Sequence, residues 1–172
     1  MRETTTSKKK MYLETSVPSA YYDDRSPKRE AQTREFWQGL DLYAPFSSDL
    51  VEKEVRKLEQ YGDKHVELMA AILALVEEHS LLRVTEAVNQ LADEYVKQGV
   101  VSSRMRDDAR HLALATINQM DFLVSWNFKH LVRSETRERV RQINETLGYA
   151  SFIIASPIDF LEGGKHYEPQ EG

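Results

Sequence analysis

Three acidic side chains stand at positions where the sequence pattern predicts burial. Glu14 directly follows the apolar run 11–13, which has the pattern of a short core strand. Glu54 and Asp108 fall on the apolar faces of two predicted helices. A buried carboxylate costs free energy unless it is paired, protonated or bound to a cation. All three positions therefore need a chemical explanation.

The two helical acids are identified by the angular positions of their neighbours. Glu54 falls inside the apolar arc of the helix expected over 48–60, where the other charged residues lie on the opposite side. In the helix expected over 103–119, Asp108 points inward and Asp107 points outward. For any single acid of this kind, an ion pair at the edge of the core is the ordinary explanation.

Taken together, the three acids favour a metal site. Each lies near the start of a helix or the end of a strand, where loops can bring distant segments together. Like charges in one pocket repel each other, and a divalent cation compensates them. Because the donors are all oxygens, Mg²⁺ or Mn²⁺ is the expected ion. The sequence has no cysteine, which excludes a thiolate metal site and a disulfide framework.

A polar loop follows the strand expected over 121–125. Asn127 lies just past the end of this strand, on the same rim as Glu14. Its amide oxygen could bind a metal or hold a water molecule, or it could cap the turn. Lys129 and His130 could meet a phosphate, and a charged surface loop is the alternative for both.

Other side chains near these segments have a less specific pattern. His111 follows Asp108 by about one helical turn and could orient that carboxylate, or it could be a surface or interfacial histidine. Arg133, Arg137 and Arg141 form a row along one helix that could guide a nucleic-acid backbone. Glutamates interrupt this row, so a solvated helix face is the simpler interpretation.

These residues require a scaffold of alternating strands and helices. Strands are expected over 10–13, 42–46, 121–125 and 151–155, with a weaker one over 81–84. Helices are expected over 17–24, 27–40, 48–60, 63–79, 85–98, 103–119 and 135–147, with a turn near 157–161. Strands separated by helices predict a mostly parallel sheet covered on both faces. Ligands of such sheets bind beyond the carboxyl ends of the strands, which is where Glu14 lies.

Length and composition predict one soluble domain between two tails. The 172 residues, of which 41% are apolar, suffice for a single core. We expect a disordered N-terminal tail at 1–9 and a C-terminal tail at 162–172. We also expect a cytoplasmic location, because there is no signal-peptide pattern. No apolar run approaches the ~18 residues of a membrane span. The net charge of −5 argues against a protein that only coats nucleic acid, but it permits a nuclease with an acidic metal site.

The motifs together resemble the PIN domain family of metal-dependent ribonucleases, and within it the VapC-type toxins of type II toxin–antitoxin systems. The resemblance covers residues 10–161, which we expect to form one PIN-like nuclease domain. It rests on YLETSVPSAYYDD, SSDLVEKEV, INETLGY and FIIASPIDFL. The most specific segment is DDARHLALATINQMDFLVSWNFKHL, which joins an inward acid, a helix of small residues, a strand and a polar loop.

This resemblance implies an α/β fold, a three-layer α/β/α sandwich with a mostly parallel central sheet. The family's three metal-binding acids and its fourth site position fall on Glu14, Glu54, Asp108 and Asn127. The hydroxyl that the family keeps beside its first acid falls on Thr15 or Ser16. Glu14 is longer than the usual aspartate and Asn127 is uncharged, so one tightly held ion or a reduced activity would follow.

The resemblance further implies hydrolysis of RNA phosphodiester bonds. A bound Mg²⁺ or Mn²⁺ would lower the pKa of a water molecule and stabilise charge on the phosphate. The implied partners are an RNA substrate, a cognate antitoxin protein and a second copy of the chain. The helices over 27–40 and 63–79 offer apolar residues for such contacts or bury them within the monomer. These residues include Phe36, Trp37, Leu68, Ile72 and Leu75.

Two alternatives remain on the sequence alone. A catalytically weak PIN-like module that only binds RNA or protein is slightly favoured by the uncharged Asn127. A phosphate-receiving signalling domain also gathers acids at a sheet edge. It ranks last because it needs an acid pair after the first strand, where Glu14 stands alone.

Overall fold

An all-parallel sheet forms the centre of the computed structural model, which describes residues 7–57, 70 and 81–161. The five described strands follow the order β3-β2-β1-β4-β5. They are β1 (Lys10–Leu13), β2 (Ala44–Ser48), β3 (Leu81–Leu82), β4 (Phe122–Val124) and β5 (Ile153–Ala155). Every predicted strand is present, and the predicted α/β class with a parallel sheet is confirmed.

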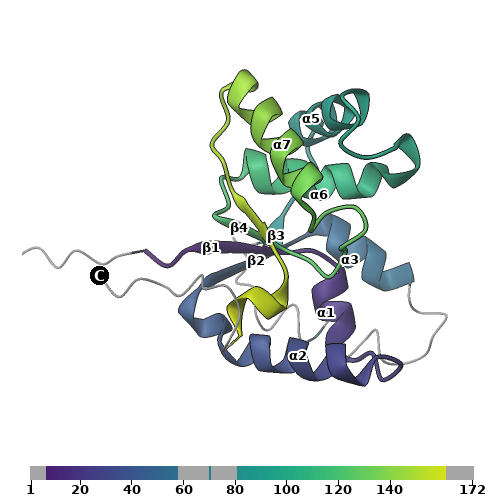
Figure 1. Ribbon diagram of the computed structural model, residues 1–172, viewed down its shortest axis with the longest axis vertical. Helices are drawn as coiled ribbons and strands as arrows, with labels where there is room; N and C mark the ends of the chain where they lie inside the picture. Colours follow the sequence, from purple (N-terminus) through teal and green to yellow (C-terminus); the bar gives the residue numbers. More distant parts are fainter. Residues whose placement is uncertain (1–6, 58–69, 71–80, 162–172) are drawn as a thin grey trace, which may run out of the picture.

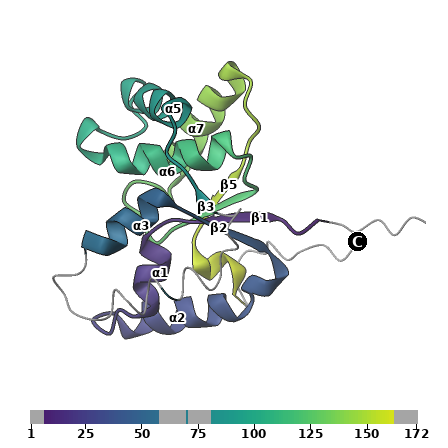
Figure 2. The same cartoon turned by 180° about the vertical axis from the view of Figure 1, so that it is seen from behind.

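Helices cover both faces of this sheet, which makes a three-layer α/β/α sandwich (Figures 1 and 2). One layer contains α1 (Ser16–Tyr21) and α2 (Pro27–Gln38), with the short turns η1 (Leu40–Leu42) and η5 (Pro157–Phe160). The other contains α3 (Asp49–Arg56), α5 (Glu86–Lys97), η4 (Ser103–Met105), α6 (Arg106–Ile117) and α7 (Ser134–Leu147). The helix predicted over 63–79 lies outside the described residues, apart from position 70.

The strands supply alternate side chains to two separate cores. Met11 and Leu13 of β1 pack with α1 and α2, whereas Tyr12 between them packs with α3, α5 and α6. In β4, Val124 belongs to the first core and Leu123 to the second. This is the two-residue period of a strand that is covered on both faces. Neighbouring residues of one strand therefore reach different layers.

β2 begins later than the sequence predicted. The apolar pattern indicated a strand over 42–46, but the strand runs from Ala44 to Ser48 because residues 40–42 form the turn η1. The pairing of Ala44 with Lys10 fixes this register. As a result, Ser48 ends the strand and caps α3, where its Oγ accepts a hydrogen bond from the backbone N–H of Val51 (3.1 Å).

A buried hydrogen-bond cluster joins the three long helices of the second layer. The hydroxyl of Tyr95 on α5 donates to Asn144 Oδ1 on α7 (2.5 Å) and contacts Thr116 Oγ1 on α6 (2.9 Å). Burial raises the pKa of Tyr95 to about 12, although both hydrogen bonds oppose the rise. The phenol therefore stays protonated, and the cluster fixes α6, which carries Asp108, against its neighbours.

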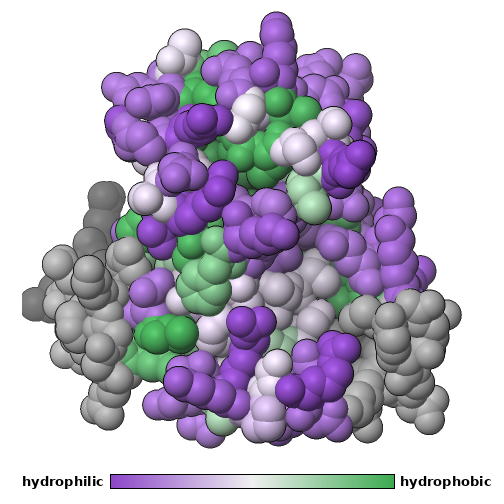
Figure 3. Space-filling view, turned by 45° about the vertical axis from the view of Figure 1, so that its right-hand side comes forward, coloured by the Kyte–Doolittle hydropathy of each residue, from purple (hydrophilic) through white to green (hydrophobic). Residues whose placement is uncertain are grey.

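The apolar residues predicted for partner contacts are partly used within the monomer. Phe36 is buried in the first core, and Trp37 packs against the same core. Leu68, Ile72 and Leu75 lie outside the described residues. On the face shown in Figure 3, hydrophilic side chains predominate and apolar ones form small patches between them.

None of the described helices combines the length and the apolar character that crossing a membrane requires.

Candidate active site

The predicted site residues gather at the carboxyl edge of the sheet, beyond which α1 and α3 begin (Figure 1). In the pairing of β1 with β4, Leu13 lies opposite Val124, and the backbone N–H of Glu14 donates to the Val124 carbonyl (3.0 Å). Glu14 and Ser125 therefore leave adjacent strands side by side. Ser48 ends β2, the other neighbour of β1.

The carboxylate of Glu14 is buried and held by uncharged donors. Glu14 is only 5% exposed. Its Oε2 accepts hydrogen bonds from the Ser16 backbone N–H (3.1 Å), from the Ser16 hydroxyl and from the Ser125 hydroxyl (2.8 Å). The Ser16 hydroxyl in turn accepts from the backbone N–H of Trp126 (2.8 Å). Within the described chain, Oε1 takes no hydrogen bond, so one oxygen is fixed in place and the other is open to a ligand.

Glu54 is held in a similar way on α3. Its Oε1 accepts from the Thr15 hydroxyl (3.1 Å) and from His111 Nε2 (2.6 Å). Because a carboxylate can only accept, Nε2 of His111 carries a proton in this contact. The sequence left open whether His111 orients Asp108 or is a surface or interfacial histidine. In the structure the ring is buried and bonds to Glu54 on α3. Among the described residues, nothing donates to Glu54 Oε2.

A buried relay supports His111 from behind. The hydroxyl of Tyr12 lies 2.6 Å from His111 Nδ1 and 2.8 Å from Ser48 Oγ. Burial raises the pKa of Tyr12 well above its ordinary value, and the negative charges of Glu14 and Glu54 add to the rise. Burial lowers the pKa of His111, but its hydrogen bond to Glu54 and the nearby carboxylates outweigh this and raise it above 6.5. The imidazole is therefore fixed at both nitrogens.

Asp108, in the first turn of α6, has no such support. Within the described chain its carboxylate makes neither a hydrogen bond nor an ion pair. Burial raises the pKa of Asp108 from 3.8 to about 6, and the charges of Glu14, Glu54 and Asp107 add to the rise while His111 opposes it. Asp107 instead pairs with Arg110 (2.6 Å), as expected for the outward aspartate. Asp108 is thus an uncompensated acid close to two others.

The arrangement supplies the chemistry of a cation site but not a finished coordination sphere. In the part of the chain that the structure describes, no three His, Asp or Glu side chains stand close enough around one point to hold a metal ion. The donor set nevertheless suits Mg²⁺ or Mn²⁺, since it consists of carboxylate oxygens, and four of the six oxygens of Glu14, Glu54 and Asp108 take no hydrogen bond from the described residues. Binding would require the three carboxylates to draw together.

Asn127 closes a turn, and within the described chain it makes no hydrogen bond to an acidic side chain. Its Oδ1 accepts from the backbone N–H of His130 (3.0 Å), and its own backbone N–H donates to Ser125 Oγ (2.9 Å). Its carbonyl accepts from the N–H groups of Leu131 and Val132. The amide thus performs the capping role that the sequence left open as an alternative.

The remaining predicted residues divide between the acids and the loop. The hydroxyls of Thr15 and Ser16 bind Glu54 and Glu14, respectively. Lys129 and His130 lie in the loop after β4, and the described residues provide no hydrogen bond or ion pair for either side chain. In the arginine row, Arg137 donates to the Ile154 carbonyl (2.9 Å) and Arg141 pairs with two glutamates, which supports the solvated-face interpretation.

Two residues of the site escaped the sequence analysis. Ser125 is fully buried and donates to Glu14, and Tyr12 anchors His111. The register of β1 against β4 would have pointed to Ser125, because the residue after each strand lies at the same edge. Tyr12 gave no signal, since an aromatic residue within a strand is an ordinary core residue.

Comparison with known proteins identifies the fold. No protein-family model matches the sequence, and no curated protein matches it. Among solved structures, the chain is similar to the crystal structure of VapBC2 from Rickettsia felis bound to a DNA fragment from their promoter, with a TM-score of 0.53 and 14% sequence identity. The match covers 86% of this chain and 98% of that chain. At this level of identity, the similarity concerns the fold alone.

Proposed function

We propose that this protein is a metal-dependent endoribonuclease of the VapC type, which hydrolyses RNA phosphodiester bonds at the carboxyl edge of its sheet. The observation that carries the proposal is that Asp108, which has no partner in the described chain, lies half-buried close to Glu14 and Glu54: burial first, and then the charges of these two acids, raise its pKa. The fold similarity to the VapBC2 structure supports the same assignment. We also propose a PIN-type site, with Asn127 as its loop residue.

The three carboxylates would hold Mg²⁺ or Mn²⁺, which when bound supplies the positive charge that activates water and stabilises a phosphate transition state. Ser16 and Ser125 fix Glu14 through Oε2, and Thr15 and His111 fix Glu54 through Oε1. In each case the other carboxylate oxygen takes no hydrogen bond from the described residues. Because three of the four residues are neutral donors, they orient the acids without cancelling their charge.

Neutral pH suits this site. With a pKa of about 6, Asp108 is largely ionised at pH 7.5 and holds a proton near pH 5. Cation binding needs the ionised form. The proposed activity should therefore decline as the pH falls through about 6.

Cleavage of a single-stranded RNA tests the proposal, with Asp108→Asn compared to Asp107→Asn. The two aspartates are adjacent, but Asp107 pairs with Arg110 on the outside of α6. With Mn²⁺, we expect Asp108→Asn to lower the cleavage rate by about 100-fold or more, whereas Asp107→Asn changes it little. EDTA should abolish cleavage. Activity that survives both EDTA and Asp108→Asn would reject the mechanism.

A binding module without catalysis is the second candidate function. It is favoured by the use of the Asn127 amide in a turn and by the lack of a ready three-donor group among the described residues. Calorimetry with Mn²⁺ separates the two functions. The nuclease should bind Mn²⁺ at pH 7.5 and lose this binding in Asp108→Asn, whereas the module should bind none.

We further propose a homodimer and a cognate antitoxin partner. The antitoxin would cover the part of the carboxyl edge of the sheet that carries Glu14, Glu54 and Asp108, which we call the acidic edge. The similar solved structure is a VapBC2 complex on promoter DNA, which supports a protein partner for this chain. Phe36 is buried in the monomer core and is not available for a dimer contact, whereas Trp37 is only partly buried. Size-exclusion chromatography with light scattering, with and without the product of a neighbouring reading frame, tests both partners.

A further inference from the structure

A hollow of about 520 Å³ lies between the loop that follows α5 and the loop that follows β4. One side is formed by Lys129, His130 and Arg133, of which the lysine and the arginine are cationic. The other side includes three valines, Val96, Val100 and Val101. We call this hollow the basic pocket. Its size is within the range of pockets that bind small organic ligands.

The positive groups of the basic pocket are largely uncommitted. The side chains of Lys129 and His130 have no hydrogen bond or ion pair within the described chain. Arg133 donates to Thr136 Oγ1 (3.0 Å) and lies 3.3 Å from a carboxylate oxygen of Glu135, which is 72% exposed. An exposed pair of this kind contributes little, so the guanidinium keeps most of its capacity to bind an anion.

Both walls of the basic pocket lead to the acidic edge. The loop that carries Lys129 starts at Ser125, whose hydroxyl donates to Glu14. The opposite wall continues through η4 into α6, where Asp108 lies in the first turn. Both walls are also held firmly, because Asn127 closes the first loop and the Val100 backbone N–H bonds to the Tyr95 carbonyl (2.9 Å). Each wall is therefore joined to a residue of the proposed catalytic site by a short stretch of chain.

We propose that the basic pocket binds a phosphodiester group of the RNA substrate next to the bond that is cleaved. This inference rests on the proposed ribonuclease function and names the contact that retains its substrate. The chain has a net charge of −5, and the acidic edge repels phosphate. A polyanion is held there only if cations nearby offset this repulsion, and Lys129 and Arg133 provide them, with His130 as a further hydrogen-bonding group. The valine wall can accept the ribose or base of the same nucleotide.

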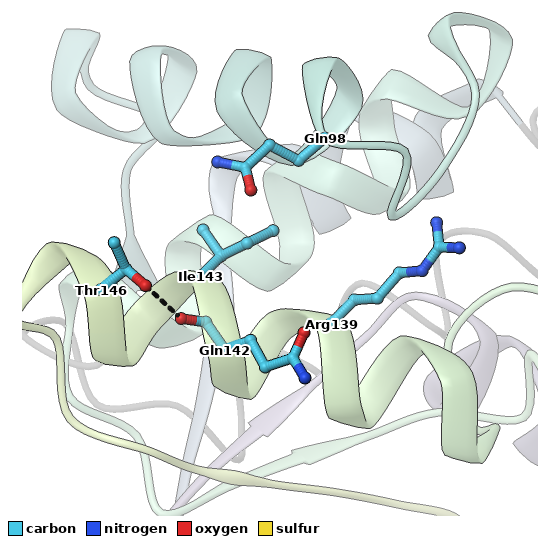
Figure 4. A pocket seen from close by; sticks show the side chains of 5 residues that line it. All are labelled: Gln98, Arg139, Gln142, Ile143 and Thr146. Carbon is cyan, nitrogen blue, oxygen red and sulfur yellow. Dashed lines mark hydrogen bonds between the residues drawn. The ribbon is translucent and has the colours of Figure 1, made fainter.

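A second hollow in the same layer differs from the basic pocket in having no free cationic side chain among its lining residues. It has a volume of about 340 Å³ and lies between the end of α5 and α7 (Figure 4). Of its five lining residues only Arg139 is charged, and its Nη1 donates to the Gly99 carbonyl (2.6 Å). Thr146 is likewise engaged, with the carbonyl of Gln142 (3.0 Å). This hollow therefore offers no free cation to a phosphate.

RNA affinity measured in EDTA tests the proposal without any contribution from metal binding or cleavage. The probe is a fluorescently labelled single-stranded RNA, titrated by anisotropy at several salt concentrations. The test variant is Lys129→Glu, and the matched control is Lys28→Glu on α2, in the opposite layer of the sandwich. We expect Lys129→Glu to weaken binding by about tenfold and to reduce the slope of log affinity against log salt by about one. Lys28→Glu should leave both unchanged.

Each outcome bears on the pocket separately from the nuclease. Equal RNA affinity for both variants and the unsubstituted protein would overturn the proposal and leave an acidic segment of a partner protein as the occupant. Failure of the unsubstituted protein to bind RNA would overturn it as well. Weaker binding in Lys129→Glu alone supports the pocket even if Mn²⁺ gives no cleavage, in which case only the ribonuclease function fails. Calorimetry should show that Lys129→Glu still binds Mn²⁺, which shows that the acidic edge is intact.

Discussion

Two parts of the acidic edge are built in opposite ways. On the side of β1 and α3, Glu14 and Glu54 each have one oxygen bound by two or more donors. On the side of α6, the carboxylate of Asp108 has no partner within the described chain, and burial with like charges raises its pKa to about 6. The first part is organised before any ligand arrives. The second is destabilised until a proton or a cation compensates it.

This difference indicates how a folded chain can keep three acids together. Hydrogen bonds from Ser16, Ser125 and Thr15 replace much of the water that two of the carboxylates lose on burial. The cost that remains is concentrated on Asp108. A site of this kind trades stability for function, because the energy of repulsion is released when a cation binds. Substitutions on the two sides should therefore change stability in opposite directions.

Removal of the Glu14 carboxylate should have the largest effect on stability. Glu14→Ala leaves the buried hydroxyl of Ser125 and both donors of Ser16 without their acceptor. Since hydrogen bonds to charged groups are the stronger ones, we expect a loss of about 3 kcal/mol in the free energy of unfolding. Urea denaturation at pH 7.5 measures it. Glu14→Gln keeps an acceptor oxygen and should lose less; a Glu14→Ala protein as stable as the unsubstituted one would contradict the contrast.

Neutralising Asp108 should instead raise the free energy of unfolding. The raised pKa means that folded Asp108 binds its proton more tightly than the unfolded chain does, so its ionisation opposes folding. This penalty is absent below the ordinary pKa of 3.8, grows as the pH rises and is complete above about 6. The two values correspond to about 3 kcal/mol, which we reduce to about 2 kcal/mol for partial exposure.

Asp108→Asn should therefore be about 2 kcal/mol more stable than the unsubstituted protein at pH 8, and nearly equal to it at pH 3.5. Denaturant titrations at both pH values, without added metal, measure this difference. Asp107→Asn is the control, and its loss of an exposed ion pair with Arg110 should change stability by less than about 0.5 kcal/mol. A destabilised Asp108→Asn at pH 8 would show that Asp108 is not strained.

Removal of the Tyr12 hydroxyl, which supports His111 behind Glu54, should have the smallest effect on the free energy of unfolding. Tyr12→Phe keeps the ring but removes the hydroxyl that joins His111 Nδ1 to Ser48. We expect a loss of about 1 kcal/mol, together with weaker Mn²⁺ binding because the imidazole is no longer fixed. The proton resonances of the His111 ring should shift in NMR spectra. An unchanged Mn²⁺ affinity in calorimetry would limit the relay to a structural role.

Sequence reasoning succeeded where one local pattern decided the outcome. Glu14 was recognisable because a short apolar run ends at it, and the inward placement of Glu54 and Asp108 followed from helical periodicity. It failed at the start of β2, because the leucines of 40–42 suit a strand as well as a 3₁₀ turn. His111 was correctly placed on α6, but its partner could not be inferred without the position of α3.

By itself, the sequence determined the alternation of strands and helices and the parallel sheet, and it predicted which acids stand near the carboxyl edge of that sheet. These follow from periodicities and connections that are local along the chain. Only the tertiary structure decided that Ser125 supports Glu14, that His111 holds Glu54 and that Asp108 lacks a partner among the described residues. Such contacts join residues that are distant in sequence, and strand register and helix packing, which no local pattern encodes, set their distances.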